Sequence, residues 1–475
     1  MSGIRFGTDG WRAIIAKDFT FDNCRKVAQA IASFVSNSGA KKKGLVIGYD
    51  NRFMSQQFAR ECAQVMVGNG IKVYFLNKTT PTPVTAFAIT LVEAGGAVMI
   101  TASHNPPEYN GLKFIPEYAG PAMPEVTNAI EAELERIVSG GKVYGLNLDE
   151  ASQLGLYEEI DVDRDYLLHL SKIVDVEVFK KRNLKVIVDP MFGAGIGYLS
   201  NLLSEWGCEV KTINNFRDVL FGGLLPEPTE SNLSDLKRAV VSYNAHIGLA
   251  MDGDADRFGI IDQGGSFVNA NTFLYLLLDH LLKTRTGRGP VARTVATTHM
   301  IDRIARKNGL SVLETPVGFK YISQALREKG CIMGGEESGG FSMLGHIPEK
   351  DGILAGLLAV EMIAAQEKSL KEIKETLDQE YGKAVSKRFD IKVAKTAKAE
   401  IMSQIAAYSP KTVASAKVDT ISREEGLKVL LEDGSWFLIR TSGTESLVRL
   451  YVEASDEENL ELIKDQVING MNIKY

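Results

Sequence analysis

One order of segments, strand, helix, strand, helix, strand, recurs three times along the chain. It first appears as apolar runs at 45–49, 72–76 and 97–100 that alternate with helical apolar spacing at 55–67 and 84–93. It returns at 184–188, 196–205, 210–213, 233–243 and 247–251, and again at 291–296, 300–307, 312–315, 321–328 and 331–333. Repetition of one supersecondary plan predicts three similar α/β domains with mainly parallel sheets.

The C-terminal stretch follows a different order. Strands are expected at 388–393, 427–431, 436–439 and 448–453, and helices at 398–407 and 458–467. The turn sequence EDGS at 432–435 favours a hairpin between two of these strands. We therefore predict a fourth, α+β domain and place the domains at 1–155, 156–258, 259–370 and 371–475, which suits a chain of 475 residues.

Charge and apolar patterning narrow the range of partners. The net charge is −6 and no long basic run occurs, so the electrostatic footprint of nucleic-acid binding is missing from the sequence. The first twelve residues lack the apolar stretch of a signal peptide, and the apolar run at 273–282 is interrupted by Asp279 and His280. Four well-separated cysteines without a CxxC pair signal neither a zinc site nor a disulfide framework. We expect a cytoplasmic protein that binds small molecules and no membrane.

Four polar loops directly follow expected strands. They are TASHNPPEYNG at 101–111, DGDADR at 252–257, GGEESGG at 334–340 and RTSGTES at 440–446. In open α/β sheets, ligands bind at the carboxyl ends of the strands. The loops of the four domains are therefore expected to converge on one cleft.

The first of these loops contains a candidate nucleophile. Ser103 lies at a strand end beside His104, and Lys113 follows ten residues later. A serine hydroxyl needs such neighbours to become nucleophilic, although a serine in this context is also common in ordinary turns.

The second loop is a candidate metal site. Asp252, Asp254 and Asp256 place three carboxylates within five residues, and these repel one another unless a hard divalent cation gathers them. An EF-hand would need Gly and Glu where the chain has Arg257 and Gln263. A solvated turn remains open, as does a phosphatase in which Asp252 is the nucleophile.

The third and fourth loops suit a sugar and a phosphate. GGEESGG offers carboxylates and a hydroxyl that can hold vicinal sugar hydroxyls, with a polar hairpin as the alternative. RTSGTES offers Arg440, two hydroxyls and a glycine amide, and Arg449 follows on the next strand. Such a composition favours a phosphate cradle, although Ser-Gly-Thr turns are common.

Together the motifs resemble those of the α-D-phosphohexomutases, in the same order and over essentially the whole chain. TASHNP is similar to the family's phosphoserine loop, DGDADR to its metal loop, GEESGG to its sugar loop and RTSGT to its phosphate loop. FGTDGWR at 6–12 resembles the family's N-terminal signature. The resemblance implies an isomerase that works through phosphoserine and a hexose 1,6-bisphosphate, with Mg²⁺ as cofactor and glucose 1,6-bisphosphate as activator.

The resemblance also implies a role for each matching residue. Ser103 would carry the phosphoryl group and would bind Mg²⁺ together with Asp252, Asp254 and Asp256. His104 and Lys113 would assist proton movement and charge stabilisation, Arg12 would face the phosphoserine, and Arg257 would support the metal loop and the substrate. Glu336 and Ser338 would hold the sugar's 3- and 4-hydroxyls. The phosphate that is not transferred would be held by Arg440, Ser442, Gly443, Thr444 and Arg449.

Further segments resemble phosphoglucomutases more closely than phosphoglucosamine mutases. These are GEESGG with HIPEKDG at 346–352, VARTVATT at 291–298 and TPVGFK at 315–320, which add Arg293, Gly318 and Lys320 as candidate substrate residues. Gly340 stands where many dual-specificity enzymes have His. We expect interconversion of glucose 1-phosphate and glucose 6-phosphate. Phosphomannomutase, dual specificity, phosphoglucosamine mutase, a phosphatase and a non-catalytic sugar-phosphate binder remain alternatives.

Overall fold

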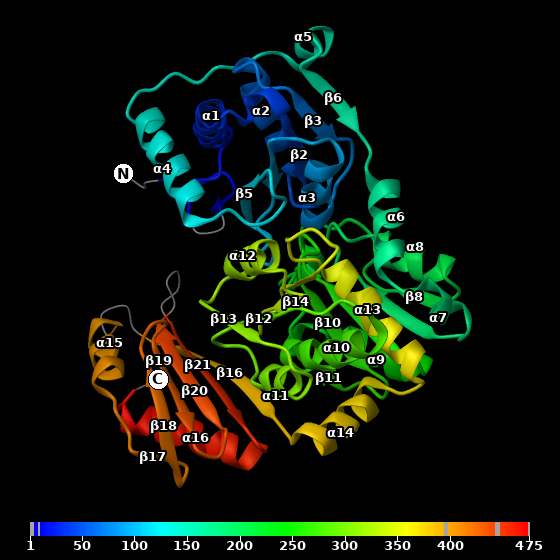
Figure 1. Cartoon of the computed structure of the whole chain (residues 1–475). Coiled ribbons are helices and arrows are strands. Elements are labelled where there is room, and N and C mark those ends of the chain that lie inside the picture. The colour runs from blue at the N-terminus through cyan, green and yellow to red at the C-terminus, as the bar shows by residue number, and fades with distance from the viewer. Residues whose placement is uncertain (1–3, 8–9, 394–397, 442–446, 474–475) are drawn as a thin grey trace.

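The computed structural model describes residues 4–7, 10–393, 398–441 and 447–473. The chain forms four units in sequence order, each built on its own β-sheet (Figure 1). Among the helices of these residues, none is long and apolar enough to cross a membrane.

The first sheet has the strand order β1-β5-β4-β2-β3-β6. Its strands are β1 (Trp11–Ile14), β2 (Leu45–Tyr49), β3 (Val73–Leu76), β4 (Gly96–Ile100), β5 (Tyr109–Pro116) and β6 (Tyr157–Ile160). Strands β4, β2, β3 and β6 pair in parallel, whereas β5 and β1 add an antiparallel edge. Strand β6 lies just beyond the expected boundary at residue 155.

Helices cover both faces of this sheet. They are α1 (Phe21–Ser38), α2 (Ser55–Gly68), α3 (Thr82–Leu91), α4 (Pro124–Val138) and α5 (Leu148–Gln153), with a short 3-10 turn η1 (Ala40–Lys43). Alternate residues of β2 enter different cores: Val46 packs with the α3 side, and Leu45 and Ile47 pack with the α1 and α2 side. Burial on both faces explains the continuous apolar run of β2.

The second sheet has the order β11-β10-β9-β7-β8. Its elements are α6 (Asp163–Ile173), α7 (Val176–Lys180), β7 (Lys185–Asp189), α8 (Tyr198–Glu205), β8 (Glu209–Thr212), η2 (Phe221–Gly223), η3 (Glu230–Asn232), α9 (Ser234–Tyr243), β9 (Ile247–Met251), β10 (Phe258–Asp262) and β11 (Phe267–Val268). Strands β9, β7 and β8 are parallel, and β10 and β11 form an antiparallel edge.

The third sheet has the order β13-β12-β14-β15. Its elements are α10 (Ala270–Thr284), β12 (Val291–Thr294), α11 (Met300–Lys307), β13 (Val312–Thr315), α12 (Phe319–Lys329), β14 (Met333–Gly335), β15 (Phe341–Met343), α13 (Gly352–Gln366) and α14 (Leu370–Tyr381). Helix α13 is buried from Gly352 to Ala364, because it lies between elements of the second and third units (Figure 1). A helix that is apolar on all sides requires such a central position.

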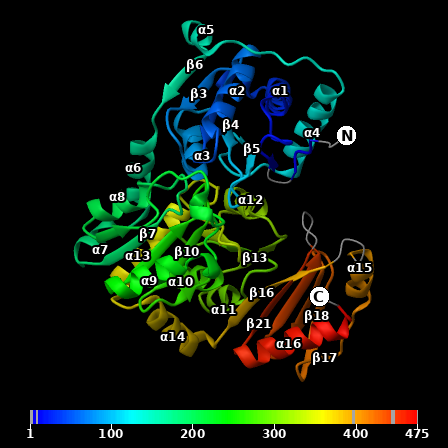
Figure 2. The same ribbon diagram turned by 180° about the vertical axis from the view of Figure 1, so that it is seen from behind.

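The fourth unit is an antiparallel sheet of order β16-β21-β20-β19-β18-β17. Its elements are β16 (Val385–Lys392), α15 (Lys398–Ala407), β17 (Thr412–Val413), β18 (Ala416–Ser422), β19 (Leu427–Leu431), β20 (Trp436–Thr441), β21 (Leu447–Ala454) and α16 (Glu457–Gly470). Both helices pack on one face, whereas Trp436, Leu438 and Tyr451 on the other face contact Ala296 of the third unit (Figure 2). The expected class, three α/β domains followed by an α+β domain, is confirmed.

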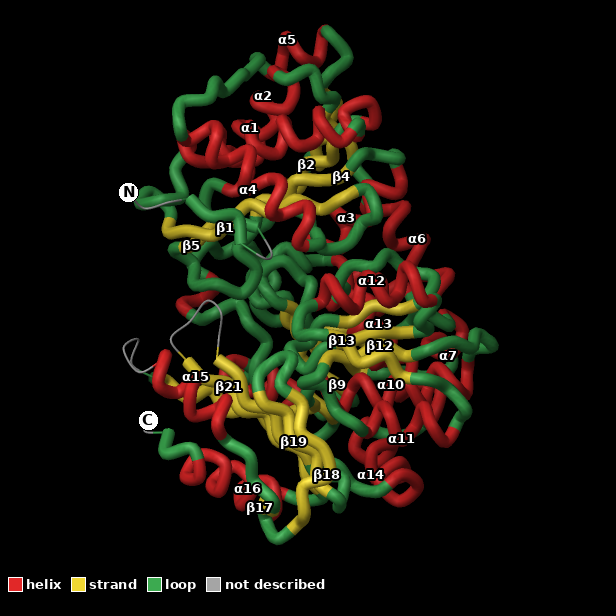
Figure 3. The backbone as a smooth tube through the Cα atoms, turned by 60° about the vertical axis from the view of Figure 1, so that its left-hand side comes forward, coloured by secondary structure: helices red, strands yellow, loops and turns green. Residues whose placement is uncertain are grey.

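The third strand of each α/β repeat ends at the loop expected from the sequence. Thr101 follows β4, Asp252 follows β9 and Glu336 follows β14. Strand β5 begins at Tyr109, so the first loop is shorter than its sequence motif. Loops fill much of the region between the first sheet and the third (Figure 3).

Candidate active site

The loop after β4 holds Ser103 in an unusual conformation. Ser103 has φ 52°, in the left-handed region, which costs a non-glycine residue about 1–3 kcal/mol. Its N–H donates to Thr101 Oγ1 at 2.9 Å, which helps to hold this conformation. The Ser103 hydroxyl donates to Asp252 Oδ2 at 2.9 Å, and His104 Nδ1 lies 3.3 Å from it. The backbone therefore aims the candidate nucleophile at the second domain.

The three aspartates of the second loop form one cluster. Asp252, Asp254 and Asp256 are almost completely buried, and one carboxylate oxygen from each lies within 4.8 Å of the others. Asp254 Oδ1 and Asp256 Oδ1 are buried and receive no hydrogen bond from the described part of the chain. Buried carboxylate oxygens without donors fit a hard cation that prefers oxygen ligands, such as Mg²⁺. The residues present therefore suit the expected metal.

The cluster divides its charge unequally. Burial, followed by repulsion from Asp254 and Asp256, holds the pKa of Asp252 well above its ordinary value. Burial acts in the same direction on Asp254, but the Lys113 ammonium and the Thr82 hydroxyl outweigh it and lower the pKa of that carboxyl. A divalent cation would offset the repulsion that, together with burial, raises the pKa of Asp252.

Two lysines neutralise the other side of the cluster. Lys113 Nζ lies 3.1 Å from Asp254 Oδ2 and 3.4 Å from Asp256 Oδ2. Lys350 Nζ, from the loop before α13, lies 3.1 Å from Asp256 Oδ2. Both lysines are buried, so their charges act in a poorly screened environment. The first and third domains thus each supply a cation to the acidic loop of the second.

His104 is surrounded by positive charge. The Arg257 guanidinium, then burial, then Arg12 hold the pKa of His104 well below its ordinary value. Arg12 on β1 donates to Asn105 Oδ1 at 2.7 Å, which places its guanidinium beside the serine loop. Arg257 donates its backbone N–H to Asp252 Oδ1 at 3.0 Å. These neighbours favour the neutral form of the His104 imidazole, in which one ring nitrogen keeps a lone pair.

The serine and aspartate loops touch at a glycine. A Cβ on Gly253 would lie 2.6 Å from the carbonyl oxygen of Ser103, closer than van der Waals contact allows. The Ser103 carbonyl belongs to the backbone, and so does the Cα of Gly253 that would carry the Cβ. A change of side-chain rotamer therefore cannot relieve the contact. Gly253 is thus required for the approach of the two loops.

Gly253→Ala is expected to lower kcat about 100-fold, since a misplacement of about 1 Å at reacting groups has this effect. Steady-state kinetics together with thermal unfolding would test it. Gly287→Ala is the control, because the nearest atom to a Cβ there is Leu344 Cδ2 at 3.9 Å. Wild-type kcat in Gly253→Ala would contradict the tight approach.

The third loop carries a buried carboxylate. Glu336 Oε1 accepts the N–H of Gly318 at 3.1 Å, and burial followed by repulsion from Glu337 raises the pKa of Glu336 to about 7. Ser338, on the same loop, is partly exposed. Lys320, in the first turn of α12, is also partly exposed. A Cβ on Gly340 would meet Glu336 Oε2 and Lys350 Cδ, both at 2.9 Å. A larger side chain at position 340 therefore requires the Glu336 or Lys350 side chain to move.

The fourth domain presents paired arginines. Arg440 on β20 and Arg449 on β21 are directly opposite each other. Charges of Glu337, Arg440 and Arg449 all act on Tyr451, so this end of the sheet lies near the third-domain loop. Ser442, Gly443 and Thr444 lie outside the described residues.

Arg293 differs from the other candidates. Its guanidinium donates to Asp302 at 2.5 and 2.8 Å and to Glu314 Oε2 at 2.6 Å. Lys428 of the fourth domain also donates to Glu314 Oε2, at 2.7 Å. The structure thus places Arg293 in an ion-pair cluster between the third and fourth domains, apart from the Ser103 contacts.

Several residues at the site were not singled out from the sequence. They are Asp50 and Arg52 after β2, Thr82 at the start of α3, and Lys350. Asp50 and Arg52 follow an apolar strand in the sequence YDNR, so the strand-end rule that located the other loops applies to them as well. Lys350 lies in the segment HIPEKDG at 346–352, but its contact with Asp256 could not be predicted from the sequence, because it joins positions 94 residues apart, from 256 to 350.

The sequence matches four domain families of known proteins. Residues 3–140, 164–265, 269–381 and 390–470 match domains I, II, III and the C-terminal domain of phosphoglucomutase/phosphomannomutase, and the first three are described as alpha/beta/alpha. The matches follow the order of the four sheets.

Full-length relatives and solved structures agree with this. The chain is 32% identical over 461 residues to a phosphoglucomutase/phosphomannomutase of Thermococcus kodakarensis, covering 96% of both chains. It is 33% identical over 464 residues to a probable phosphoglucosamine mutase of Pyrococcus abyssi, covering 98% of this chain and 97% of that one. The structure of a putative phosphomannomutase from Thermus thermophilus is similar with a TM-score of 0.86 and 31% identity, over the full length of both chains. The chain therefore belongs to the phosphoglucomutase/phosphomannomutase family of phosphohexomutases and is an enzyme of the isomerase class.

Proposed function

We propose that this enzyme interconverts glucose 1-phosphate and glucose 6-phosphate through a phosphorylated Ser103. The observation that carries the proposal is the contact between the Ser103 hydroxyl and Asp252 Oδ2 at 2.9 Å, inside a cluster of three buried aspartates. A phosphoserine carries a charge of about −1.5 to −2 and cannot stay beside these carboxylates without a cation. Asp252, Asp254, Asp256 and Ser103 would hold Mg²⁺, which supplies electrostatic stabilisation of the transferring phosphoryl group.

Each of the two phosphoryl transfers forms one P–O bond and breaks another. The free hydroxyl oxygen of the hexose phosphate bonds to phosphorus as the bond from phosphorus to Ser103 Oγ breaks. The hydroxyl proton passes to a base, and Ser103 Oγ takes up a proton as it leaves. Neutral His104 is positioned for this role, with Lys113 and Arg12 offsetting the phosphate charge. After the bisphosphate turns over, Ser103 Oγ bonds to its other phosphorus as the bond from that phosphorus to the sugar oxygen breaks. The Ser103 proton passes to a base, and the sugar oxygen takes up a proton. Glucose 1,6-bisphosphate would restore the phosphoserine whenever it is lost.

Substrate recognition is assigned to the third and fourth domains. Glu336 and Ser338 would accept and donate hydrogen bonds to the 3- and 4-hydroxyls, and Gly318 and Lys320 would flank them. Arg257, Arg440 and Arg449 would hold the phosphate that is not transferred, together with Ser442, Gly443 and Thr444. One phosphate site then serves both orientations of the sugar, which the mutase cycle requires.

The preferred hexose is tested by a panel of 1-phosphates with Mg²⁺ and glucose 1,6-bisphosphate present. We expect kcat/KM for glucose 1-phosphate to exceed that for mannose 1-phosphate by roughly 10- to 100-fold, because a mismatched polar contact at the 2-position costs about 1–3 kcal/mol. Equal or higher kcat/KM for mannose or glucosamine 1-phosphate would replace the glucose assignment. Release of inorganic phosphate as the main product would instead support the phosphatase alternative.

Glu336→Gln is expected to raise stability at high pH and not at low pH. The pKa of Glu336 is raised to about 7 from 4.5, so ionisation of this carboxyl opposes folding. This destabilisation of the folded state is absent below about pH 4.5, where the carboxyl is protonated in both states. It grows between about pH 4.5 and pH 7 and reaches at most about 3 kcal/mol above pH 7. Glutamine keeps the acceptor for Gly318 N and carries no charge.

Thermal unfolding of both proteins at pH 5 and pH 8 would measure this. The variant should melt at a temperature close to that of the wild type at pH 5 and several degrees higher at pH 8. Glu328→Gln, on the exposed face of α12, is the control and should show no such dependence. A pH-independent difference for Glu336→Gln would remove the buried charge as its cause.

A further inference from the structure

Arg52 donates hydrogen bonds from both terminal nitrogens to the segment that carries Ser103. Its Nη2 donates to Ser103 O at 2.7 Å and to Asn105 O at 2.6 Å. Its Nη1 donates to Pro106 O at 2.8 Å and to Tyr109 O at 3.0 Å. The side chain is completely buried. A guanidinium has four terminal N–H groups in one plane, and here each meets a different carbonyl of the loop.

Few backbone hydrogen bonds lie within the loop itself, although from β1 and its end Arg12 donates to Asn105 Oδ1 at 2.7 Å and Ile15 N–H donates to Glu108 O at 2.8 Å. Within residues 102–109, backbone N–H groups close two internal hydrogen bonds, from Asn105 to Ala102 and from Tyr109 to Pro106. Pro106 and Pro107 have no N–H to contribute. Ser103 is also in the left-handed region of φ, which needs support from its surroundings. Four carbonyls therefore converge on a single cation, and one of them, Pro106 O, also accepts the Tyr109 N–H.

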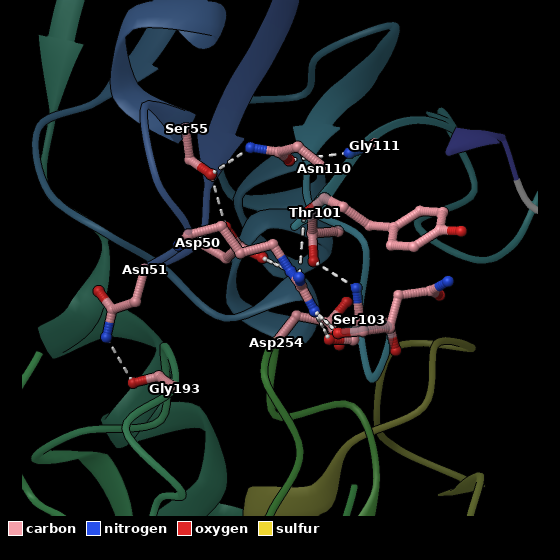
Figure 4. Close-up of polar contacts among 12 residues, drawn as sticks. Asp50, Asn51, Ser55, Thr101, Ser103, Asn110, Gly111, Gly193 and Asp254 are labelled. Carbon is pink, nitrogen blue, oxygen red and sulfur yellow. Dashed lines mark hydrogen bonds and ion pairs between the residues drawn. The ribbon is translucent and has the colours of Figure 1, made fainter. Parts of the chain in front are cut away.

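Arg52 is itself held in place by Asp50. Asp50 Oδ2 lies 3.3 Å from Arg52 Nε, and Asp50 Oδ1 accepts the Ser55 hydroxyl at 2.7 Å. The Ser55 oxygen in turn accepts the Asn110 amide at 3.0 Å. Figure 4 shows Asp50, Ser55 and Asn110 together on the first-domain side of Ser103, with Asp254 beyond it. The guanidinium is thus held by Asp50 just after β2, and Asp50 is itself positioned by Ser55 on α2 and, through it, by Asn110 on β5.

The same segment contacts the second domain. The Phe221 ring lies 5.0 Å from Arg52 Cζ, and Asn51 Nδ2 donates to Gly193 O at 2.7 Å. Gly193 packs so closely on the metal loop that a Cβ there would lie 2.8 Å from Gly253 O. Segment 50–52 therefore contacts both the loop that carries Ser103 and Gly193, which packs against the loop that carries the three aspartates.

We propose that Arg52 is a positioning residue for phosphoryl transfer, which fixes Ser103 relative to the aspartate cluster by binding four carbonyls of the serine loop. This inference rests on the proposed role of Ser103. Arg52 is completely buried and donates to the Ser103 carbonyl rather than to its hydroxyl, so it acts on the rate of transfer and leaves sugar binding to the other domains.

Arg52→Lys is expected to lower kcat about 100-fold, because an ammonium keeps the charge beside Asp50 but cannot bind four coplanar carbonyls. The KM for the hexose phosphate should change less than about threefold, since the groups that grip the sugar are intact. Single-turnover transfer from phosphorylated enzyme should slow by the same factor as kcat, which a purely structural role would not produce.

Arg285→Lys is the matched control. Arg285 binds both oxygens of Glu361 at 2.7 and 2.9 Å and Ile173 O at 3.1 Å, so it combines a buried carboxylate and a carbonyl far from Ser103. It should lose thermal stability and keep kcat within about twofold, because it supports no reacting group. Asp50→Asn is a second test variant that keeps the side-chain shape and weakens the hold on Arg52, with an expected fall in kcat of about tenfold.

The outcomes separate this inference from the function it rests on. If Ser103→Ala is inactive while folded Arg52→Lys and Asp50→Asn keep wild-type kcat, the positioning role is refuted and the phosphoserine mechanism stands. If Ser103→Ala is active, the proposed function fails first. A fall in kcat of Arg52→Lys no larger than that of Arg285→Lys at matched stability also overturns the inference; should Arg52→Lys not fold, Asp50→Asn decides alone.

Discussion

Ser103→Ala is expected to lower mutase kcat by at least about 10⁴-fold, the largest effect of any single substitution in this chain. The variant loses the hydroxyl proposed to carry the phosphoryl group, while the left-handed backbone, the Arg52 contacts and the aspartate cluster remain. The rest of the protein should fold as before, because alanine removes one hydrogen bond to Asp252 and leaves no larger gap.

Coupled assay of glucose 6-phosphate formation and intact-mass analysis measure this together. Wild-type enzyme treated with glucose 1,6-bisphosphate should gain one phosphate on the peptide containing Ser103, and Ser103→Ala should gain none. Ser342→Ala is the control: it removes another buried hydroxyl, which donates to Ile347 O at 2.6 Å, and should leave phosphorylation intact. Phosphate found on Asp252, or substantial activity of Ser103→Ala, would refute the mechanism proposed above.

Removal of divalent cations is expected to have the second largest effect, a loss of about 10³-fold or more in kcat. The buried oxygens of Asp254 and Asp256 without donors are the reason, since a transferring phosphoryl group beside unneutralised carboxylates is strongly disfavoured. Added Mg²⁺ should restore activity to enzyme treated with a chelator.

Binding of the ion has a readout independent of turnover. At about 100 times the Kd, Mg²⁺ should stabilise the folded protein by about 2.7 kcal/mol, which thermal unfolding detects as a rise in Tm. Asp254→Asn should abolish this rise. Asp189→Asn is the control, because Asp189 is buried at the end of a neighbouring strand but is satisfied by Met191 N and Asn214. Full turnover in excess chelator would exclude the metal from the reaction.

The sequence predicted the α/β repeats because their signals are local. Strand β9 at 247–251, helix α11 at 300–307 and strand β19 at 427–431 lie where apolar periodicity placed them. The loops after β4, β9 and β14 followed from the same pattern. Helices α1 and α13 and strand β5 were not anticipated, although α13 forms the shared core of two domains. Its apolar residues extend around the whole helix and leave no amphipathic period to recognise.

The roles of individual side chains were less accessible. Glu336 and Arg293 both lie in motifs that resemble substrate-binding segments, but one carboxylate is buried beside Gly318 and the arginine is engaged by Asp302 and Glu314. A motif gives the type of residue at a strand end. It does not give the partner that occupies that side chain, because the partner comes from a distant part of the chain.

The sequence by itself determined the four-domain order, the family and the loops that carry Ser103 and the three aspartates, since each depends on residues close together in the chain. The tertiary structure decided how these loops meet: Ser103 with Asp252, Lys113 and Lys350 with the aspartates, and Arg52 under the serine loop. These contacts join positions between 51 and 149 residues apart along the chain, measured from Arg52 to Ser103 and from Ser103 to Asp252. Only the packing of whole elements and domains brings such positions to hydrogen-bond distance. Local periodicity and composition therefore cannot predict these contacts.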